Sequence, residues 1–427
     1  MTPLRRVAGR TFSSAFTSRN LRLYFAGSSI SQIGTWIQLV ALPWLVLHIT
    51  HSGAMLGLTY ALQFFPILVF GAWAGVIADR HDKRKLMMVT TTAQGVLAFV
   101  LGIFVLADIV NLWIIVVFAL AMGTANAFDN PARRSFVPEL VEHGEVTNAV
   151  SLSNAVFTSA RIVGPSIAGI LIATVGIGWC FVINALSFAG VIGALLLMNT
   201  REIRAAVPIK RERGQLMAGL RYAWDEPLVR LAIIMTIVVG VLTFNYQVVL
   251  PLLAKRTFDG GAGSYALMFA ATGVGSLFGA LASAHRARAS GRLMALSSIA
   301  LGITMGLAAV APTLLIEYIV LVPMGAAGMM FFSMANAAVQ EQADGPMLGR
   351  VTALFSVAFL GSTPIGSPLI GAISQAFGAR VALAIGAVSA LVTGVVALVA
   401  LRHWLGRARA RREPPTEVLG SVGAAAA

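Results

Sequence analysis

Charged residues are scarce in this sequence. Asp, Glu, Lys and Arg make up 11% of its 427 residues and hydrophobic residues 58%, whereas soluble domains carry about 25% charged residues. This deficit excludes an ordinary soluble protein. A helix that crosses a bilayer needs about 20 mainly apolar residues, so the length suits many spans with short loops and leaves no room for a large soluble domain.

The residues that common catalytic and metal-binding sites require are also missing. Cys180 is the single cysteine, so no disulfide can form within the chain. The sequence has no Cys/His cluster for a metal ion and no Gly-x-x-x-x-Gly-Lys-Ser/Thr loop for the phosphates of ATP. Its six histidines lie in loops or at the ends of apolar runs, away from any acid within a run. We therefore expect no enzyme, no catalytic residue, no metal and no cofactor.

Acidic residues are absent from the first 22 positions, which include Arg5, Arg6, Arg10, Arg19 and Arg22. The mostly apolar run that follows, 23–47, is too long for the core of a secretory signal peptide, which has about 7–15 residues. We therefore expect this run to be the first transmembrane helix.

Apolar runs long enough to cross a membrane occur twelve times along the chain. They are 24–47, 54–78, 86–107, 111–128, 150–173, 178–199, 228–252, 264–284, 292–311, 313–337, 351–375 and 379–401. The sequence therefore predicts an all-α polytopic membrane protein with twelve transmembrane helices.

The basic residues are unevenly divided between the two sides of the predicted membrane. Nearly all of the 31 Lys and Arg residues fall on one side; Lys255, Arg256 and Arg380 fall on the other, and Arg161 lies inside a span. Because short cytoplasmic loops are enriched in Lys and Arg, both termini are expected to be cytoplasmic. The net charge of +14 is thus spread over short loops at one membrane face, and no nucleic-acid partner is expected.

A polar break divides the spans into two sets of six. The pattern Gly75 to Asp79 recurs at Gly279 to Ser283, and Gly164 and Gly169 match Gly366 and Gly371, which indicates two six-helix pseudo-repeats. The break is a mixed-charge stretch and predicts an amphipathic helix at the membrane surface. The expected domains are a tail 1–23, a half 24–200, a linker 201–227, a half 228–402 and a disordered tail 403–427.

The turn between the second and third spans combines a small residue with a dense charge cluster. Without further information, it is either a turn whose charges only reflect the enrichment of Lys and Arg on one side of the membrane, or a functional loop. It resembles the G-x-x-x-D-R-x-G-R-K loop of the major facilitator superfamily, with Asp82 where that family usually has glycine. The resemblance implies an inner gate that locks the two halves together, with a predicted pairing of Asp79 and Arg350. The residues it assigns to this gate are Gly75, Asp79, Arg80, Lys83 and Arg84, and we add Asp129, Arg133 and Arg350 as further gate candidates.

The fifth span contains Arg161, Gly164, Pro165 and Gly169. Proline removes a helical hydrogen bond and glycines permit close helix contact, so a bent and tightly packed helix is expected. The segment is similar to the G-P-x-x-x-G element of exporters of the superfamily. Many of those exporters have an arginine in the fourth span, where this chain is apolar near Ala119, and we hypothesise that Arg161 supplies that charge instead.

The longest match runs from Phe128 to Val141 and continues through 148–152. With Gly34-Thr35-Trp36 and Leu348-Gly349-Arg350-Val351, it resembles the branch of the superfamily that contains siderophore and macrolide exporters. The resemblance covers about residues 15–402 and implies the major facilitator fold and efflux.

Polar and aromatic side chains within the spans are the candidates for a substrate cavity, because polar groups at membrane depth tend to face a cavity or each other. Interhelical hydrogen bonds that only hold the bundle together are the alternative for each. The candidates are Trp36, Gln38, Gln63, Asn126, Asn154, Thr158, Arg161, Asn245, Gln247, Asn336 and Gln340.

The sequence thus predicts a secondary-active exporter of a small amphipathic molecule in the bacterial inner membrane. The expected partners are membrane lipid, the substrate and, by elimination of ATP, protons as the coupling ion. We expect a monomer. A nutrient importer of the same fold and a membrane sensor that transports nothing remain alternatives.

Overall fold

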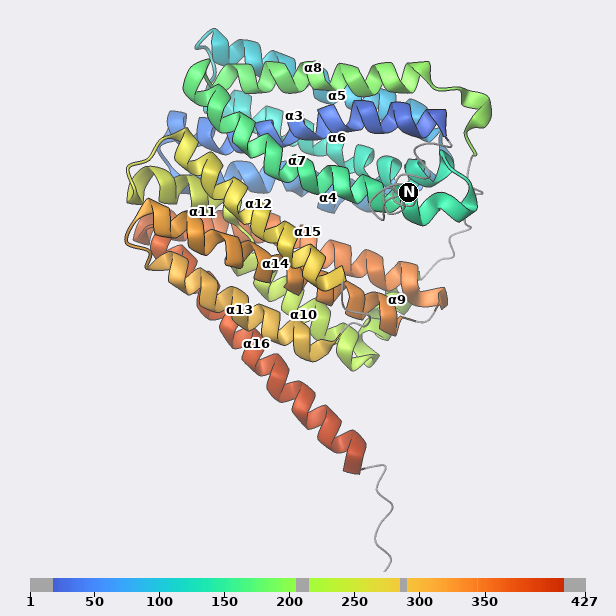
Figure 1. Ribbon diagram of the computed structural model, residues 1–427, viewed down its shortest axis with the longest axis vertical. Coiled ribbons are helices and arrows are strands. Elements are labelled where there is room, and N and C mark those ends of the chain that lie inside the picture. Colours follow the sequence, from blue (N-terminus) through green and yellow to red (C-terminus); the bar gives the residue numbers. More distant parts are fainter. Residues whose placement is uncertain (1–17, 205–214, 285–289, 344, 411–427) are drawn as a thin grey trace, which may run out of the picture.

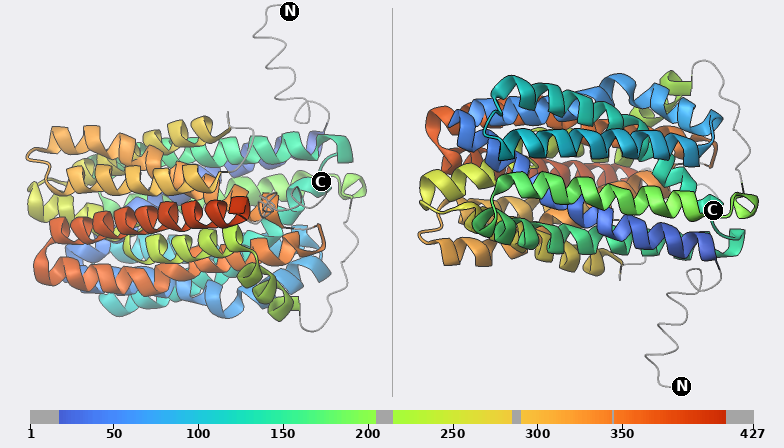
Figure 2. Two further views of the ribbon diagram at one scale, coloured as in Figure 1. Left: turned by 90° about the horizontal axis from the view of Figure 1, so that it is seen from below. Right: turned by 90° about the horizontal axis from the view of Figure 1, so that it is seen from above.

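The structure is a computed structural model that describes residues 18–204, 215–284, 290–343 and 345–410. Throughout these ranges the chain is helical, with short connections and no strand. The long helices pack side by side, and most run in roughly the same direction, while α7, α12 and α16 are inclined to the others in Figure 1 (Figures 1 and 2).

Twelve of the helices are long and apolar enough to cross a membrane in the described ranges, the number predicted from the sequence. The first six spans are α3 Arg19–Thr50, α4 Gly53–Arg80, α5 Lys83–Leu106, α6 Leu112–Glu139, α7 Val146–Thr174 and α8 Ile177–Leu197, with the short η1 His143–Glu145 before α7 and η2 Thr200–Glu202 after α8.

The last six spans follow α9 Gln215–Asp225, a helix that the linker sequence predicted. They are α10 Pro227–Leu242 with α11 Tyr246–Leu252 and the short π-helix η3 Leu253–Thr257, then α12 Ala262–Ala284, α13 Gly291–Ala309, α14 Leu314–Gln342, α15 Gly345–Phe377 and α16 Ala379–Ala410. The predicted tail from residue 403 begins inside α16, and residues 411–427 lie outside the described part of the chain.

Polar residues in the short connections start many of these helices. The side chains of Ser18, Ser52, Asp82, Asn111 and Thr313 each accept a hydrogen bond from a backbone N–H in the first turn of the helix that follows. Such caps satisfy donors that have no partner within a helix. The local sequence therefore determines where each of these helices starts.

Most spans differ from their predicted extents at their ends, and α16 runs to Ala410 where residue 401 was expected. The fourth and seventh spans differ in ways that reflect their contacts. The fourth was expected to end at residue 128, but α6 continues to Glu139, and within this extension Asp129 pairs with Arg133 and Glu139 pairs with Lys83. The seventh is broken at Thr243–Asn245 between α10 and α11. Asn245 donates from Nδ2 to the Val241 carbonyl at 2.8 Å and accepts from Ser367 Oγ at 3.0 Å, so its side chain satisfies the interrupted backbone.

The two sets of six helices form the two sides of the molecule in Figure 1, with α3, α5, α6 and α8 on one side and α10, α13, α14 and α16 on the other. They meet through α4 against α15 and α7 against α12. The second span of one set thus contacts the fifth span of the other in both cases, as a twofold pseudo-symmetry would produce.

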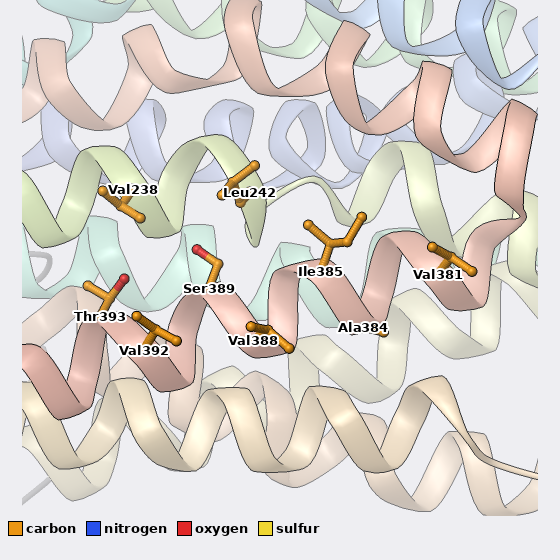
Figure 3. Close-up of a pocket in the computed structure, with 9 residues that line it drawn as sticks. All are labelled: Val238, Leu242, Val381, Ala384, Ile385, Val388, Ser389, Val392 and Thr393. Atoms are coloured by element: carbon orange, nitrogen blue, oxygen red, sulfur yellow. The ribbon is translucent and has the colours of Figure 1, made fainter.

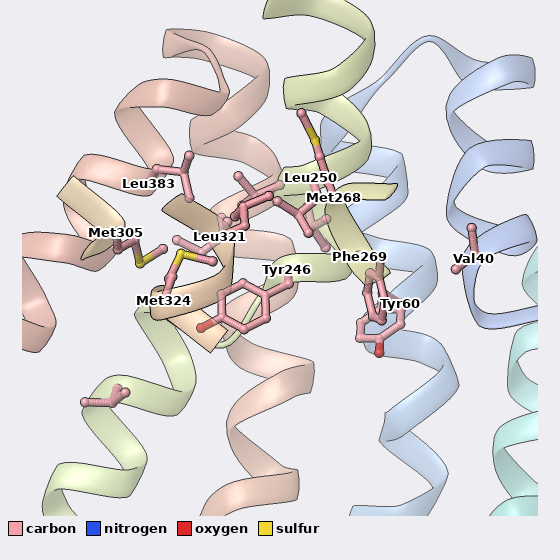
Figure 4. Close-up of a cluster of buried hydrophobic side chains, with 14 of the residues drawn as sticks. Val40, Tyr60, Tyr246, Leu250, Met268, Phe269, Met305, Leu321, Met324 and Leu383 are labelled. Carbon is pink, nitrogen blue, oxygen red and sulfur yellow. The ribbon is translucent and has the colours of Figure 1, made fainter. Parts of the chain in front are cut away.

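Buried apolar side chains fill both sets and the region between them. Figure 4 shows part of this core, with Tyr60 of α4, Phe269 of α12, and Tyr246, Leu250 and Leu321 from other helices of the last six spans. Cys180 in α8 belongs to this core and is fully buried. One hydrophobic cluster therefore extends across both sets of helices.

Candidate functional site

The ends of the bundle differ in their connections. One end, here called the basic end, holds the α4–α5 turn at residues 81–82, the α6–α7 connection at 140–145 and α9. The other, here called the closed end, holds the α3–α4, α7–α8 and α15–α16 turns at residues 51–52, 175–176 and 378.

Helices from the two sets approach closely toward the closed end. A Cβ added to Gly57 of α4 would overlap the backbone of Ser367 in α15, and one added to Gly371 would lie 2.5 Å from the Gly53 carbonyl oxygen. Across the other contact, a Cβ on Gly169 of α7 would meet the Ala266 Cβ of α12 at 2.7 Å. Backbones this close exclude larger side chains, so these positions require glycine.

The exporter-like motif of the fifth span therefore has two packing partners. Gly164 packs on Trp36 and Ile33 of α3, while Gly169 packs on α12 in the other set of helices. Pro165 is buried between them in α7. The motif joins the first span to the interface between the two sets.

A hydrogen-bonded group of residues, here called the polar latch, ties the two sets together at the closed end. Arg256 Nη2 donates to the His51 carbonyl at 2.5 Å and to Gln375 Oε1 at 3.0 Å. The same Gln375 oxygen accepts from the Gly53 backbone N–H at 2.7 Å. Arg256 and Gln375 belong to the last six spans, whereas His51 and Gly53 lie where α3 turns into α4, so each bond to them crosses the interface.

Aromatic side chains lie beneath the latch. Trp44 stacks on Tyr265 with 6.1 Å between ring centroids, and the Lys255 ammonium lies 5.9 Å from the Trp44 ring. Further along α3, Trp36 lies 6.0 Å from Phe269. Each of these contacts joins α3 to the last six spans, and together they extend the closure toward the middle of the bundle.

Arg161 lies at the inner edge of this closure, near the middle of α7. Its guanidinium carbon is 5.8 Å from the centroid of the Trp36 ring, and its charge interacts with the phenol groups of Tyr60 in α4 and Tyr246 in α11. The residue is partly exposed, but its Nε is buried and has no hydrogen-bond partner in the described structure. No carboxylate of the described residues pairs with it.

Other buried polar atoms near this interface are also unpartnered within the described residues. They are Trp36 Nε1, Gln63 Oε1, Tyr246 Oη and Tyr265 Oη. Buried polar groups are normally hydrogen-bonded, so a set of unpartnered groups from both sides of the molecule marks this region as the candidate functional site.

Several predicted cavity residues instead hydrogen-bond to neighbouring helices or to their own backbone. Gln38 accepts from Asn184 of α8 at 2.8 Å, Asn126 accepts from Gln94 of α5 at 3.4 Å, and Asn245 supports the break before α11. For these three the interhelical alternative describes the contacts. Tyr60, Tyr246 and Tyr265 were not selected from the sequence, because a tyrosine within an apolar run has no pattern that separates a site from the core.

The remaining cavity candidates lie on α7, α11 and α14. Thr158 donates to the Asn154 carbonyl within α7 at 2.8 Å, and Asn154 is exposed. Asn336 accepts from Gln340 within α14 at 3.2 Å, and Gln247 is partly buried in α11. Their contribution to binding stays a prediction.

Four of the eight predicted gate residues make contacts inside the first six spans. Lys83 forms a buried ion pair with Glu139 at 2.5 Å, and Arg84 Nε donates to the Leu195 carbonyl of α8 at 2.6 Å. Asp129 pairs with Arg133 and accepts from Thr90 at 2.7 Å, while Arg133 also donates to Thr91 at 3.2 Å. These contacts hold α5, α6 and α8 together at the basic end.

The other predicted gate residues lie on α4 and α15. Gly75, Asp79 and Arg80 form the last part of α4, with Asp79 and Arg80 exposed, and Arg350 Nη1 contacts Met347 Sδ at 3.5 Å within α15. The pairing of Asp79 with Arg350 is not among the ion pairs of the described residues. It stays a prediction for a state in which the basic end is closed.

An exposed ion pair joins the connections at the basic end. Arg204 donates to Glu142 at 2.8 Å, and the side chains are 53% and 74% exposed. The hydrogen bond and the positive charge of Arg204 lower the pKa of Glu142 below its ordinary value of 4.5.

An apolar groove of about 540 Å³ lies elsewhere, between α10 and α16 (Figure 3). Val238, Leu242, Val388 and Val392 contribute to it, and Ser389 and Thr393 are its polar members. Its lining matches the chemistry of lipid tails. It is separate from the α4–α15 and α7–α12 contacts that hold the candidate site.

The sequence of residues 11–418 matches the family described as transmembrane secretion effector. The chain belongs to this family of the major facilitator superfamily. The match covers nearly the whole chain, so the predicted superfamily and fold are confirmed. The protein is a membrane transporter of a small molecule with many spans, and not an enzyme.

Two relatives of known activity are similar to this transmembrane secretion effector. The enterobactin exporter EntS of Escherichia coli (strain K12) is 26% identical over 410 residues, which cover 94% of this chain and 95% of EntS. The staphyloferrin A transporter of Staphylococcus aureus (strain NCTC 8325 / PS 47) is 25% identical over 262 residues, or 61% of this chain and 66% of the relative.

Solved structures support the same fold. The nucleoside transporter NupG matches with a TM-score of 0.67 at 15% identity, covering 90% of this chain and 99% of that one. A bacterial homologue of the iron transporter ferroportin, in an inward-facing state, matches with a TM-score of 0.70 at 14% identity, covering 90% and 98%.

Proposed function

We propose that this protein exports a small amphipathic molecule, a siderophore, macrolide or other drug, across the inner membrane of a bacterium. The observation that carries the proposal is the set of unpartnered polar atoms around Arg161. They lie at the interface between the two sets of helices, next to the contacts that join these sets at the closed end. A site between two halves that open alternately is the plan of a secondary transporter. The functions of EntS and the staphyloferrin A transporter support siderophores within this substrate range.

The orientation follows from charge. Because cytoplasmic loops are enriched in Lys and Arg, we assign the basic end and both termini to the cytoplasm. The closed end then faces outward, and we propose that the substrate reaches Arg161 from the cytoplasm, the side from which an exporter takes its substrate. In the alternate state, pairing of Asp79 with Arg350 would close the basic end.

Protons are the proposed coupling ion, and Glu317 is the proposed carrier. This α14 residue is fully buried, and neither carboxylate oxygen has a hydrogen-bond partner within the described residues. The charged group acting on it is Arg380 of α16, whose guanidinium donates to the Ala311 carbonyl at 2.6 Å. Asp129 and Glu139, in contrast, are ion-paired. A proton can therefore bind Glu317 without breaking an ion pair.

The test of direction is uptake by everted inner-membrane vesicles from cells with and without the protein. We expect accumulation of a siderophore, a macrolide or a dye when the vesicle interior is acidic, and loss of accumulation when nigericin collapses the pH gradient. Accumulation in right-side-out vesicles instead would favour a nutrient importer. Absence of flux of every compound in proteoliposomes would favour a sensor.

A monomer is the proposed transport unit, because a single chain contains both sets of helices and the interface between them. Light scattering of the purified protein in nanodiscs, combined with transport by proteoliposomes that contain at most one chain each, tests this assignment. Transport lost at single occupancy would contradict it.

A further inference from the structure

Arg161 has an uncompensated positive charge at membrane depth. A charged side chain within a membrane is costly and is normally paired, yet the groups that act on the charge of Arg161 are two phenols and no carboxylate. Its Nε is buried without an acceptor among the described residues, while the residue as a whole is partly exposed. Arg161 is therefore partly accessible as a residue, and its guanidinium lacks a negative partner from the described part of the protein.

The unpartnered groups around Arg161 offer more hydrogen-bond donors than acceptors. Arginine and the indole N–H of Trp36 only donate, and the hydroxyl of Tyr246, which interacts with the charge of Arg161, can donate as well. Gln63 Oε1, about one helical turn along α4 from Tyr60, adds an acceptor. A ligand that satisfies such a set is rich in oxygen acceptors, and a planar guanidinium binds a carboxylate through two parallel hydrogen bonds.

Aromatic rings cluster around Trp36, which lies beside the same charge. Trp36 lies against the guanidinium, and Phe157 and Phe269 lie 5.6 and 6.0 Å from the Trp36 ring. Tyr60, whose phenol interacts with the charge of Arg161, lies 5.1 Å from the Phe64 ring. Such rings favour a flat apolar group in the ligand.

We propose that Arg161 is the anion-binding residue of the transport site and that the exported molecule is an organic anion with a flat aromatic or conjugated part. This inference rests on the proposed function and narrows it from amphipathic molecules in general. A cationic substrate would be repelled by Arg161, and a neutral one would leave its charge unpaired.

Two xanthene dyes of similar shape and opposite charge test the proposal. Fluorescein is anionic at neutral pH, and rhodamine 123 is cationic. We would measure the binding of each dye to the full chain in nanodiscs by fluorescence anisotropy, for the wild type, Arg161→Lys, Arg161→Gln and the control Ser166→Ala. Ser166 is on the same helix, and its hydroxyl donates to the Ile162 carbonyl at 3.2 Å.

The wild type and Ser166→Ala are expected to bind fluorescein at least about tenfold more tightly than rhodamine 123, because close charge pairs in a water-poor site favour the anion. Arg161→Gln should lose about tenfold or more in fluorescein affinity, and Arg161→Lys should keep part of it because the charge remains. Melting temperature and gel filtration identify a variant that fails to fold. If Arg161→Gln fails to fold, the test rests on the fluorescein affinity of Arg161→Lys and on the preference of the wild type for fluorescein over rhodamine 123.

The anion site would be overturned if the wild type bound the two dyes equally, preferred rhodamine 123, or bound neither dye at millimolar concentration. Unchanged fluorescein binding in folded Arg161→Gln would also overturn it. Export by everted vesicles is measured separately. Fluorescein binding through Arg161 without flux of any compound would overturn the proposed function and leave the anion site intact. Flux of cations alone would overturn the anion site and leave the proposed export function intact.

Discussion

Buried charges at the basic end of the first six spans are paired, and this pairing explains why α6 tolerates them. Lys83 and Glu139 are 7% and 5% exposed, and Asp129 is bonded to both Thr90 and Arg133. Removing one partner of a buried pair leaves the other charge unpaired, which typically costs about 3–5 kcal/mol, whereas replacing both with apolar residues is often neutral.

Replacement of Lys83 by methionine is therefore expected to destabilise the protein by about 3–5 kcal/mol. The double variant Lys83→Met/Glu139→Leu should recover most of that loss. Lys85→Met is the matched control, because Lys85 is exposed on the same helix. Denaturation of the purified protein in detergent provides the measurement, and equal stability of Lys83→Met and Lys85→Met would argue against the buried pair.

Glu142 should make a small, pH-dependent contribution to stability. Its pKa is lowered by Arg204, so the contribution is present above the ordinary pKa of 4.5 and is lost as the pH falls through the lower value in the folded state. The melting temperatures of the wild type and Glu142→Gln should differ slightly at neutral pH and converge in acid or in high salt. A difference that grows on acidification would contradict this sign.

Replacement of Glu317 by glutamine should separate substrate exchange from proton coupling. The variant keeps the shape of the side chain but cannot release a proton, so exchange of labelled for unlabelled substrate should continue while uptake driven by a pH gradient is lost. Glu341→Gln, at the exposed end of the same helix, is the control. Wild-type gradient-driven uptake by Glu317→Gln would exclude Glu317 as the carrier.

At the scale of the elements, the helices and their number could be predicted from the sequence, because apolar length alone defines a span and polar residues cap the starts of many helices. The extension of α6 past residue 128 could not, since only the fold brings Glu139 to Lys83. The break before α11 could not be predicted either, because residues 228–252 form one mostly apolar run in the sequence. Arg161 was recognisable as a lone charge, but its tyrosine neighbours come from distant segments.

Close helix contact at the closed end gives a prediction for α15. Gly371→Ala should force α15 away from Gly53 of α4 and weaken the closure, lowering the melting temperature. Gly349→Ala on the same helix should be neutral or mildly stabilising, because an added Cβ there meets nothing within 4 Å and alanine favours helix. Equal effects of the two variants would show that the α4–α15 contact does not limit stability.

At the scale of the whole molecule, the two ends are secured in different ways. The polar latch, the aromatic contacts and the glycine contacts all join the two sets of helices toward one end, while the charged residues of the basic end are paired mainly within the first set. Weakening one end is therefore expected to shift the population toward the state in which the other end closes.

Cross-linking of cysteines at positions 79 and 350 should report this shift. Gln375→Ala removes an acceptor shared by Arg256 and Gly53, so the Asp79→Cys/Arg350→Cys pair should cross-link several-fold more in that background. Thr304→Ala, which removes hydrogen bonds local to α13, is the control background. Cross-linking that stays absent with the latch removed would count against the predicted inner gate.

The burial of Cys180 makes the native chain a convenient starting point for such measurements. Its thiol is enclosed in the core of the first six spans, at 0% exposure, and it is the only cysteine in the sequence. Maleimide and spin-label reagents should therefore react with introduced cysteines in the folded protein and leave the native residue unmodified. A complete map of which positions become accessible during transport can then be obtained without first preparing a cysteine-free variant.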